Sequence, residues 1–436
     1  MMTAQKKIVS EKDFAGILEP FASPFLSLSH HAGASADNRN SKRLHMGFLA
    51  NVIKYASDVE HLLDRYRARY NLNWIYFREL TATAKNFGKA SFLLEELKKN
   101  FNREYVILPE KDDFTLKAEA ASLFLNEVLV AVFSELQKEA QRLGFSIPEE
   151  KPLSTYGLMF QKEVILPHTI EESADSEIDF TTRKILHRYV AFEEDSRFLE
   201  RVIQSKGHGL ASQIPRHINE GKLRRLGTRL HNLVSWYDSY VVNHSIEREF
   251  PELKKMRENF SVQLNLSKIG TILAHYFERH LMIPSPVVNK LKDIVSAPRL
   301  LEEAFFFTLY FLVECFHSAR AVADAVLPSM LEEVTYDLPV PQRLGFHARP
   351  STLVAKVVQQ HGADVKMLVD DQTFNAGSIL ELLSAGGYVV TKRLDQVQFR
   401  GDKRALDDLK ILAEYNYGET DNGKDVPLPE ILSYLR

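Results

Sequence analysis

The sequence has little of what secreted, zinc-cluster or membrane-spanning proteins need. It contains a single cysteine, Cys315, among 436 residues. One cysteine cannot form an intramolecular disulfide or a cysteine-based zinc cluster, and the first residues lack the apolar core of a secretory signal. The sequence therefore predicts a cytoplasmic protein.

Long apolar runs and a strong charge of one sign are also missing. The longest apolar run is AFFFTLYFLV at residues 304–313, with Glu302, Glu303 and Glu314 close to its ends. It is too short and too charged at its ends for a membrane span, so it is interpreted as a buried core helix. The formal net charge is −3, which gives no general argument for a nucleic-acid partner. We expect neither a membrane span nor nucleic-acid binding.

Strand-like alternation is scarce before about residue 330, and few glycines or prolines interrupt the periodic segments there. A chain of this length exceeds what one hydrophobic core usually organises, so a multidomain protein is expected. A typical segment, residues 38–70, repeats apolar side chains every three or four positions, as an amphipathic helix does. Its apolar positions are Leu49, Val52, Ile53, Ala56, Val59, Leu62 and Leu63. The first part of the chain is predicted to be a large all-α module.

This helical module is divided provisionally at an acidic stretch, residues 170–179. A hinge there would separate a first half, residues 1–172, from a second half, residues 173–330. A long surface loop explains the stretch equally well. A second polar stretch, residues 27–40, contains His30 and His31 and is interpreted as a solvated connector, although binding loops have a similar composition.

The pattern changes at about residue 331, where extended segments begin to alternate with short helical ones. The predicted order is β-α-β-β-α-β-α, which is typical of an α+β domain with an antiparallel sheet and its helices on one face. We assign residues 331–418 to this domain and residues 419–436 to a C-terminal tail.

The stretch GFHARPSTLVAKVV places His347 directly before an apolar helix whose first turn contains Pro350. Proline at this position removes no hydrogen bond that the helix needs, and free N–H groups with the positive end of the helix dipole favour a bound anion. Arg349 could contact the same anion through its planar donors. From spacing alone, an ordinary helix start with a solvated arginine is an equally good interpretation.

Two stretches together resemble the histidine-containing phosphocarrier family, HPr, of the phosphoenolpyruvate-dependent sugar phosphotransferase system. They are GFHARPSTLVAKVV and, at the family's usual distance, NAGSILELLSAGG. The resemblance covers residues 335–417 and implies that His347 accepts a phosphoryl group from the phosphorylated histidine of Enzyme I. It also implies that Arg349 stabilises the phosphate and that no cofactor is needed.

The second stretch is where the resemblance places partner docking and regulation. Ile379, Leu380 and Leu383 would form an apolar docking patch beside the histidine, unless they pack into the domain core. Ser378 corresponds to a position that a serine kinase phosphorylates in some family members. A serine before an apolar helix is also an ordinary N-cap, which is the interpretation we favour here.

The sequence thus predicts a phosphoryl carrier with a phosphohistidine intermediate rather than a turnover enzyme. Its partners would be Enzyme I, a phosphoryl-acceptor protein and, if Ser378 is regulated, a serine kinase, and the phosphate would pass on or control the helical module. The alternative is an interaction protein whose HPr-like fold docks partners without transferring phosphate. A weaker alternative is a helical metal-dependent enzyme regulated by the fused domain.

The helical module offers few candidates for chemistry. Three His-x-x-Glu pairs have a spacing that could place two metal ligands on one helix face: His168/Glu171, His244/Glu247 and His275/Glu278. With 15 histidines in the chain, chance pairs are expected, and no metal site is assigned. The basic stretch KLRRLGTRLHN at residues 222–232 could contact phosphate or an acidic partner, and it could equally be a solvated helix face.

Overall fold

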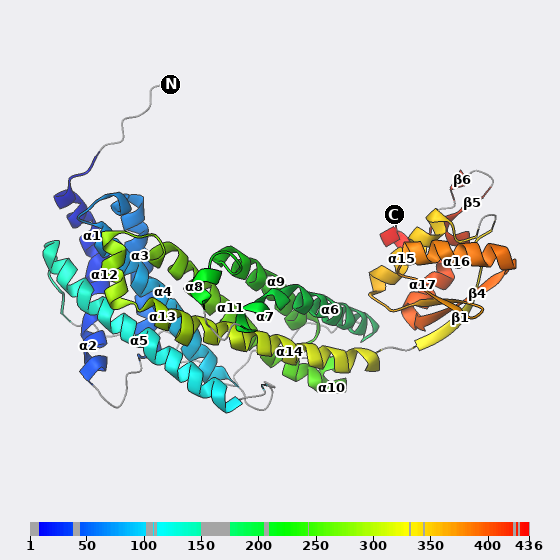
Figure 1. Cartoon of the computed structure of the whole chain (residues 1–436), viewed down its shortest axis with the longest axis horizontal. Coiled ribbons are helices and arrows are strands. Elements are labelled where there is room, and N and C mark those ends of the chain that lie inside the picture. The colour runs from blue at the N-terminus through cyan, green and yellow to red at the C-terminus, as the bar shows by residue number, and fades with distance from the viewer. Residues whose placement is uncertain are drawn as a thin grey trace, which may run out of the picture. The chain divides into compact units, whose positions relative to one another are not determined.

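The computed structural model is mostly helical and has a small antiparallel sheet near its C-terminus (Figure 1). It describes residues 8–37, 44–101, 108, 111–149, 175–204, 209–242, 244–330, 333–342, 345–421, 424–425 and 428–435. This confirms the predicted combination of a helical chain with a small C-terminal sheet domain.

The chain forms two compact units. Unit 1 comprises Met1–Glu171, Ala191–Ser235 and Leu253–Ala321, and unit 2 comprises Glu172–Val190, Trp236–Glu252 and Val322–Arg436. The predicted division at residue 172 lies outside the described residues, and the four-part division of the chain stays a prediction.

Unit 1 is built from helices. The α-helices that lie wholly within it are α1 (Glu11–Leu26), α2 (Ser29–Asp37), α3 (Met46–Arg65), α4 (Ile75–Asn100), α5 (Lys111–Arg142), α7 (Glu200–Gln204), α8 (Leu210–Gln213), α12 (Pro286–Ile294) and α13 (Ala297–Arg299). Unit 1 also contains the 3-10 helices η1 (Ala68–Tyr70) and η2 (Arg197–Leu199) and the π-helical segments η3 (Phe277–Leu281) and η4 (Leu300–Phe305). Helices assigned in part to each unit are α6 (Asp175–Ser196), α9 (Glu220–Tyr240), α11 (Glu252–Tyr276) and α14 (Phe306–Ser329).

The core of unit 1 follows the apolar periodicity of its helices. In α3 the apolar face buries Leu49, Val52, Ala56, Val59 and Leu63 completely. The stretch 27–40 is different from the expected connector, because residues 29–37 form α2. Small residues such as alanine and serine do not prevent a helix where neighbouring helices provide a packing surface.

One helical stretch, Ala297–Ser329, is long and apolar enough to cross a membrane by length and composition alone. Within its most apolar window 67% of the residues are buried in the protein, as in the core helix of a globular unit. Cys315 lies in this stretch and is fully buried. Burial raises the pKa of its thiol.

The C-terminal domain in unit 2 has four strands in the order β1-β4-β2-β3, all antiparallel to their neighbours. Along β4, Val397 and Phe399 are buried while their neighbours are exposed, so one face of the sheet carries the core. The elements are β1 (Glu333–Pro339), α15 (Ala348–His361), β2 (Lys366–Val369), β3 (Gln372–Asn375), α16 (Ile379–Lys392), β4 (Gln396–Asp402), α17 (Lys403–Glu414), η5 (Asn416–Gly418), β5 (Thr420–Asp421), β6 (Lys424–Asp425) and η6 (Glu430–Leu435).

Unit 2 also contains α10 (Ser245–Glu249) and the first part of α6. Arg183 of α6 donates a buried, charged hydrogen bond to Asp402, whose second oxygen caps α17 by accepting from the backbone N–H of Arg404. His187, one turn further along α6, lies beside Gly362 at the end of α15. Burial lowers the pKa of His187, helped by the charge of Arg183. This part of α6 therefore packs against the sheet domain.

Candidate functional site

His347 is the N-cap of α15 and stands at the point where the chain turns into that helix. Gly345 adopts a left-handed conformation with φ +61°, and the backbone N–H of His347 donates to its carbonyl over 2.9 Å. The His347 side chain makes no capping hydrogen bond, and 35% of it is exposed. The imidazole is thus available at the positive end of the helix dipole.

The buried residue Phe346 anchors the turn that precedes His347. Only 1% of it is exposed, and its ring packs against those of Phe399 and Tyr417 at centroid distances of 6.0 and 5.3 Å. Its carbonyl accepts a 3.1 Å hydrogen bond from the Ser351 hydroxyl. A Cβ added to Gly386 would lie 2.5 Å from the same carbonyl, so α16 can approach the turn before His347 only because residue 386 is glycine.

A carboxylate lies against the histidine. Glu419 Oε1 is 3.0 Å from His347 Nε2, and 14% of the Glu419 side chain is exposed. The contact has the distance of an ion pair without the angles of a regular hydrogen bond, since Oε1 has no hydrogen-bond partner among the described residues. The acidic group therefore orients one ring nitrogen by charge.

A short segment with a left-handed backbone conformation brings Glu419 next to His347. Asn416 and Tyr417 have φ values of +48° and +52°, and they reverse the chain after α17. The Tyr417 hydroxyl donates to the carbonyl of Pro339 over 2.9 Å, and Asn416 Oδ1 accepts from the backbone N–H of Gln342 over 2.9 Å. Burial raises the pKa of Tyr417, so its hydroxyl remains a donor. Two side chains thus attach the segment before Glu419 to the segment before His347.

Arg349 lies in the first turn of α15, two residues beyond the histidine, and is exposed. The first N–H groups of a helix have no partner inside it, and Pro350 has no N–H. This turn therefore combines backbone donors, the helix dipole and a guanidinium next to an accessible imidazole. Such a constellation can hold a phosphoryl group on a ring nitrogen.

A comparison with protein families supports this interpretation of the geometry. Residues 334–391 match the family model described as the PTS HPr component phosphorylation site. The C-terminal domain is HPr-like. The match includes His347, Arg349 and most of α16, and it covers only this part of the chain. No curated protein and no solved structure gives a significant match to the chain.

The apolar residues of the predicted docking patch lie on the surface of the HPr-like domain. The exposed fractions of Ile379, Leu380 and Leu383 are 39%, 77% and 37%. These values exclude the alternative that all three pack into the core. Leu382, between them, is fully buried and packs into the core together with Ala385 and Val389 of α16.

Ser378 is the N-cap of α16. Its hydroxyl accepts a long, 3.4 Å hydrogen bond from the backbone N–H of Glu381. The Glu381 carboxylate reaches back and accepts from the backbone N–H of Asn375 over 2.7 Å. The first bond satisfies a backbone donor in the first turn of α16, and the second attaches that turn to the end of β3.

Sequence reasoning gave Glu419 no role. It is one of 58 acidic residues and follows the last helix of the domain, where the sequence predicted a tail. The left-handed backbone at Asn416 and Tyr417 brings Glu419 to the histidine. Neither asparagine nor tyrosine predicts such a conformation from the sequence as strongly as glycine does. Its contact with His347 depends on tertiary structure.

The predicted His-x-x-Glu pairs do not form ligand sets in the described residues. His168 and Glu171 lie outside those residues. His275 Nδ1 contacts Glu220 over 2.9 Å rather than Glu278, whose carboxylate accepts from the Glu220 backbone N–H over 2.7 Å.

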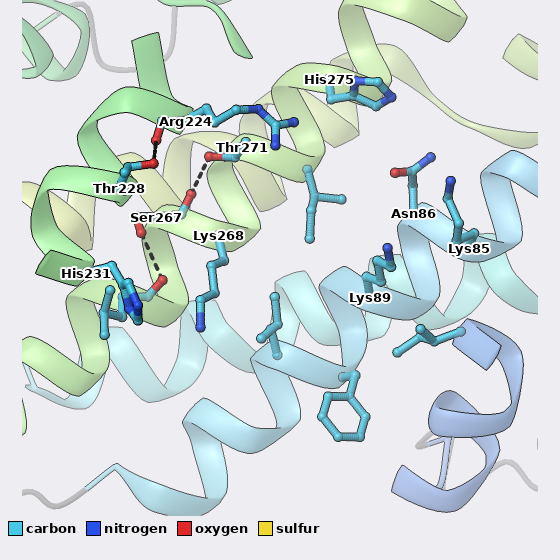
Figure 2. Close-up of a pocket in the computed structure, with 16 residues that line it drawn as sticks. Lys85, Asn86, Lys89, Arg224, Thr228, His231, Ser267, Lys268, Thr271 and His275 are labelled. Atoms are coloured by element: carbon cyan, nitrogen blue, oxygen red, sulfur yellow. Dashed lines mark hydrogen bonds between the residues drawn. The ribbon is translucent and has the colours of Figure 1, made fainter. Parts of the chain in front are cut away.

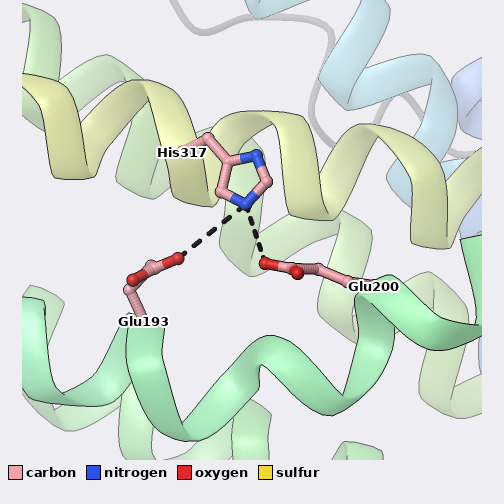
Figure 3. Close-up of side chains that lie close together, drawn as sticks. All are labelled: Glu193, Glu200 and His317. Atoms are coloured by element: carbon pink, nitrogen blue, oxygen red, sulfur yellow. Dashed lines mark hydrogen bonds and ion pairs between the residues drawn. The ribbon is translucent and has the colours of Figure 1, made fainter.

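A different cluster brings together Glu193, Glu200 and His317 in unit 1 (Figure 3). His317 Nε2 lies 3.1 Å from Glu200 and 3.8 Å from Glu193. Glu193, however, also contacts the guanidinium groups of Arg197 and Arg320 over 3.3 and 3.1 Å. Because these cations already neutralise Glu193, the cluster is explained as an ion-pair network between helices.

Proposed function

We propose that the HPr-like domain is a phosphocarrier in which His347 accepts a phosphoryl group from the phosphohistidine of Enzyme I and passes it to an acceptor protein. The observation that supports this most directly is the imidazole of His347 at the N-terminus of α15, with Nε2 held 3.0 Å from Glu419. The family match over residues 334–391 gives the same class of function. The protein would work in the cytoplasm, as HPr-like domains generally do.

The contact with Glu419 selects the reacting nitrogen. A neutral imidazole carries its proton on one nitrogen and its lone pair on the other. The negative charge of Glu419 Oε1 beside Nε2 favours the tautomer with the proton on Nε2, which leaves the lone pair on Nδ1. In the proposed step this lone pair forms a bond to phosphorus while the P–N bond of the donor phosphohistidine breaks. The donor imidazole, protonated on its other nitrogen, leaves as a neutral ring with the electrons of that bond, while phosphorylated His347 keeps its Nε2 proton. No water or cofactor takes part.

The same arrangement suits onward transfer. A carrier must release its phosphoryl group, and each 1.4 kcal/mol of extra stabilisation shifts the transfer equilibrium about tenfold. His347 is one-third exposed and contacts a carboxylate whose charge repels the phosphate dianion. Arg349 and the helix dipole offset that repulsion. The balance gives a site that holds phosphate without trapping it.

The exposed residues Ile379, Leu380 and Leu383 are the proposed docking patch for Enzyme I and for the acceptor. An exposed apolar cluster on a small domain is typical of a protein-contact surface. A partner that buried Leu380 would gain roughly 1.5–3 kcal/mol from this side chain. Ser378 borders the patch, and a phosphate there would add about two negative charges at its edge.

We further propose that phosphorylation at His347 controls the helical part of the chain. The buried ion pair of Arg183 with Asp402 supports this proposal, because it couples α6 to the start of α17 within unit 2. Losing one partner of such a pair leaves an uncompensated buried charge, so the two elements stay together.

The experiment incubates the full chain with phosphoenolpyruvate, Mg²⁺ and Enzyme I and reads the product by intact mass. We expect one acid-labile phosphate on the protein and none on a His347→Ala variant. His361→Gln is the matched control, since His361 lies on the same helix but contacts Asp408. It should be labelled like the unchanged protein.

If the full chain stays unlabelled while Enzyme I is phosphorylated, the same assay on residues 331–436 decides between two explanations. Labelling of that fragment would mean that the full chain covers the histidine. No labelling of either protein would contradict the phosphocarrier and favour an HPr-like domain that only docks partners.

A further inference from the structure

A cleft in unit 1 lies between α4, α9 and α11 (Figure 2). It encloses about 730 Å³, which is within the usual range of small-molecule sites. Its six basic side chains are Lys85, Lys89, Arg224, His231, Lys268 and His275. Its described lining includes no aspartate or glutamate.

The basic side chains come from all three helices. Lys85 and Lys89 extend from α4, and Figure 2 places them across the cleft from Lys268 of α11. Arg224 and His231 are on α9, in the basic stretch 222–232 that the sequence left without a definite role. The fold therefore concentrates positive charge in one concave place, in a chain whose net charge is −3.

Nearby carboxylates compensate only part of this charge. Glu60 pairs with Lys85, but it also lies 3.7 Å from Arg78. Glu220 is likewise shared, because it contacts both Arg224 and His275.

The other two lysines of the cleft, Lys89 and Lys268, are in no direct ion pair among the described residues, although the charge of Glu60 also acts on Lys89. Within the part of the chain that the structure describes, neither Lys89 nor Lys268 has a carboxylate within ion-pair distance. Burial, together with the adjacent charge of Lys85, lowers the pKa of Lys89. An anion in the cleft would relieve this repulsion.

The neutral polar side chains of the cleft already form hydrogen bonds within their own helices. The hydroxyls of Thr228 and Thr271 donate to carbonyls one turn earlier, over 3.0 and 2.8 Å, and Asn86 donates to Ala82 over 2.8 Å. The cations are therefore the main donors left for a ligand. The apolar side chains of the lining are Ile53, Phe92, Leu93, Leu264 and Ile272.

We propose that this cleft binds a small organic phosphate with an aromatic or similarly apolar body. The phosphate would lie between Lys89 and Lys268, the two lysines of the cleft that are in no direct ion pair, and the apolar body would lie against Phe92 and the aliphatic residues. A macromolecular anion fits less well, because the positive charge is gathered inside a concavity of small-molecule size. The proposal is independent of His347, which belongs to the other unit.

Isothermal titration calorimetry on the full chain tests the proposal with three probes: ADP, pyrophosphate and adenosine. We expect ADP to bind one to one, pyrophosphate to bind at least tenfold more weakly, and adenosine not to bind measurably. Affinity for ADP should fall as salt increases, since screening weakens charge contacts. Absence of binding by both ADP and pyrophosphate would overturn the proposal, and equal affinities for the two would overturn the role of the apolar lining.

Charge variants locate the site. Lys268→Gln and Lys89→Gln should each weaken ADP binding at least tenfold. Lys268 is exposed, so its replacement should leave the fold intact, which thermal unfolding checks. The matched controls are Lys99→Gln on α4 and Lys254→Gln on α11, two exposed lysines outside the cleft. Equal losses in the cleft and control variants would place ADP elsewhere and refute the assignment.

Discussion

Glu419 Oε1 lies 3.0 Å from His347 Nε2, although in the sequence His347 is near the start of the HPr-like domain and Glu419 is near its end. The carboxylate orients the ring and leaves Nδ1 directed away from it. A nucleophile that is held in one orientation loses less entropy when it reacts than one that rotates freely.

Replacing Glu419 by alanine should slow phosphorylation of His347 about tenfold, which is the effect expected from losing one charged contact. Glu419→Gln should be affected less, because the amide oxygen keeps a partial negative charge beside Nε2. The rate is measured from phosphoenolpyruvate and catalytic Enzyme I by intact mass. Glu414→Ala, an exposed glutamate at the end of α17, serves as the control. Unchanged kinetics in Glu419→Ala would remove the carboxylate from the mechanism.

Leu380→Ser should raise the KM for Enzyme I about tenfold and leave the thermal stability nearly unchanged. The side chain is 77% exposed, so the folded domain loses little when it is shortened, whereas a bound partner loses an apolar contact. Steady-state phosphorylation over a range of Enzyme I concentrations gives the KM. Ile431→Ser tests a similarly exposed apolar residue, 61% exposed, outside the patch. The docking patch is wrong if both variants change the KM to the same extent.

Ser378 allows the capping and charge effects to be separated. Ser378→Ala should destabilise the domain by about 1 kcal/mol through loss of the N-cap. Asparagine and aspartate both cap well, so Ser378→Asn and Ser378→Asp should keep the stability. Only Ser378→Asp adds a charge beside the apolar patch, and it should weaken docking of Enzyme I. Chemical denaturation and the KM measure the two effects, and identical KM values for the two variants would argue against regulation by charge.

Replacing each of two adjacent glycines of α16 by alanine should change the stability of the domain in opposite directions. Gly386→Ala should destabilise the domain and slow phosphorylation, because its Cβ would press on the Phe346 carbonyl that positions His347. A Cβ on Gly387 meets nothing within 4 Å, so Gly387→Ala should stabilise the helix by about 0.5–1 kcal/mol. Urea unfolding of both variants makes the comparison. A stabilised Gly386→Ala variant would contradict the close approach of α16 to residue 346.

Local sequence signals were sufficient for the elements that carry the proposed chemistry. Pro350 and the apolar spacing after it predicted α15, and the serine before an apolar run predicted the cap of α16. These features depend on residues within one or two turns of each other, and such short-range effects can be inferred from sequence. The same reasoning failed at residues 29–37, where packing rather than composition decided for a helix.

The long-range features could not be inferred in this way. Glu419 contacts His347 because Asn416 and Tyr417 reverse the chain, and no pattern in the sequence pairs the two residues. The cleft of unit 1 depends on lysines from α4 and α11 and on the basic face of α9. Each helix taken separately shows only an ordinary solvated charge, since the concave arrangement exists only after the helices have packed.

The C-terminal 3-10 helix η6 affects when the HPr-like domain can fold during synthesis. Leu432 and Leu435 are buried with Tyr417 and Val354 in one core, which also contains Phe346. Residues beyond α17 therefore complete the core next to the turn that carries His347. During synthesis the N-terminal residues of this domain leave the ribosome first, yet their core stays open until Leu435 has followed. Competence to accept phosphate should therefore arise only after translation has passed this point, and chains from stalled ribosomes would remain inactive carriers.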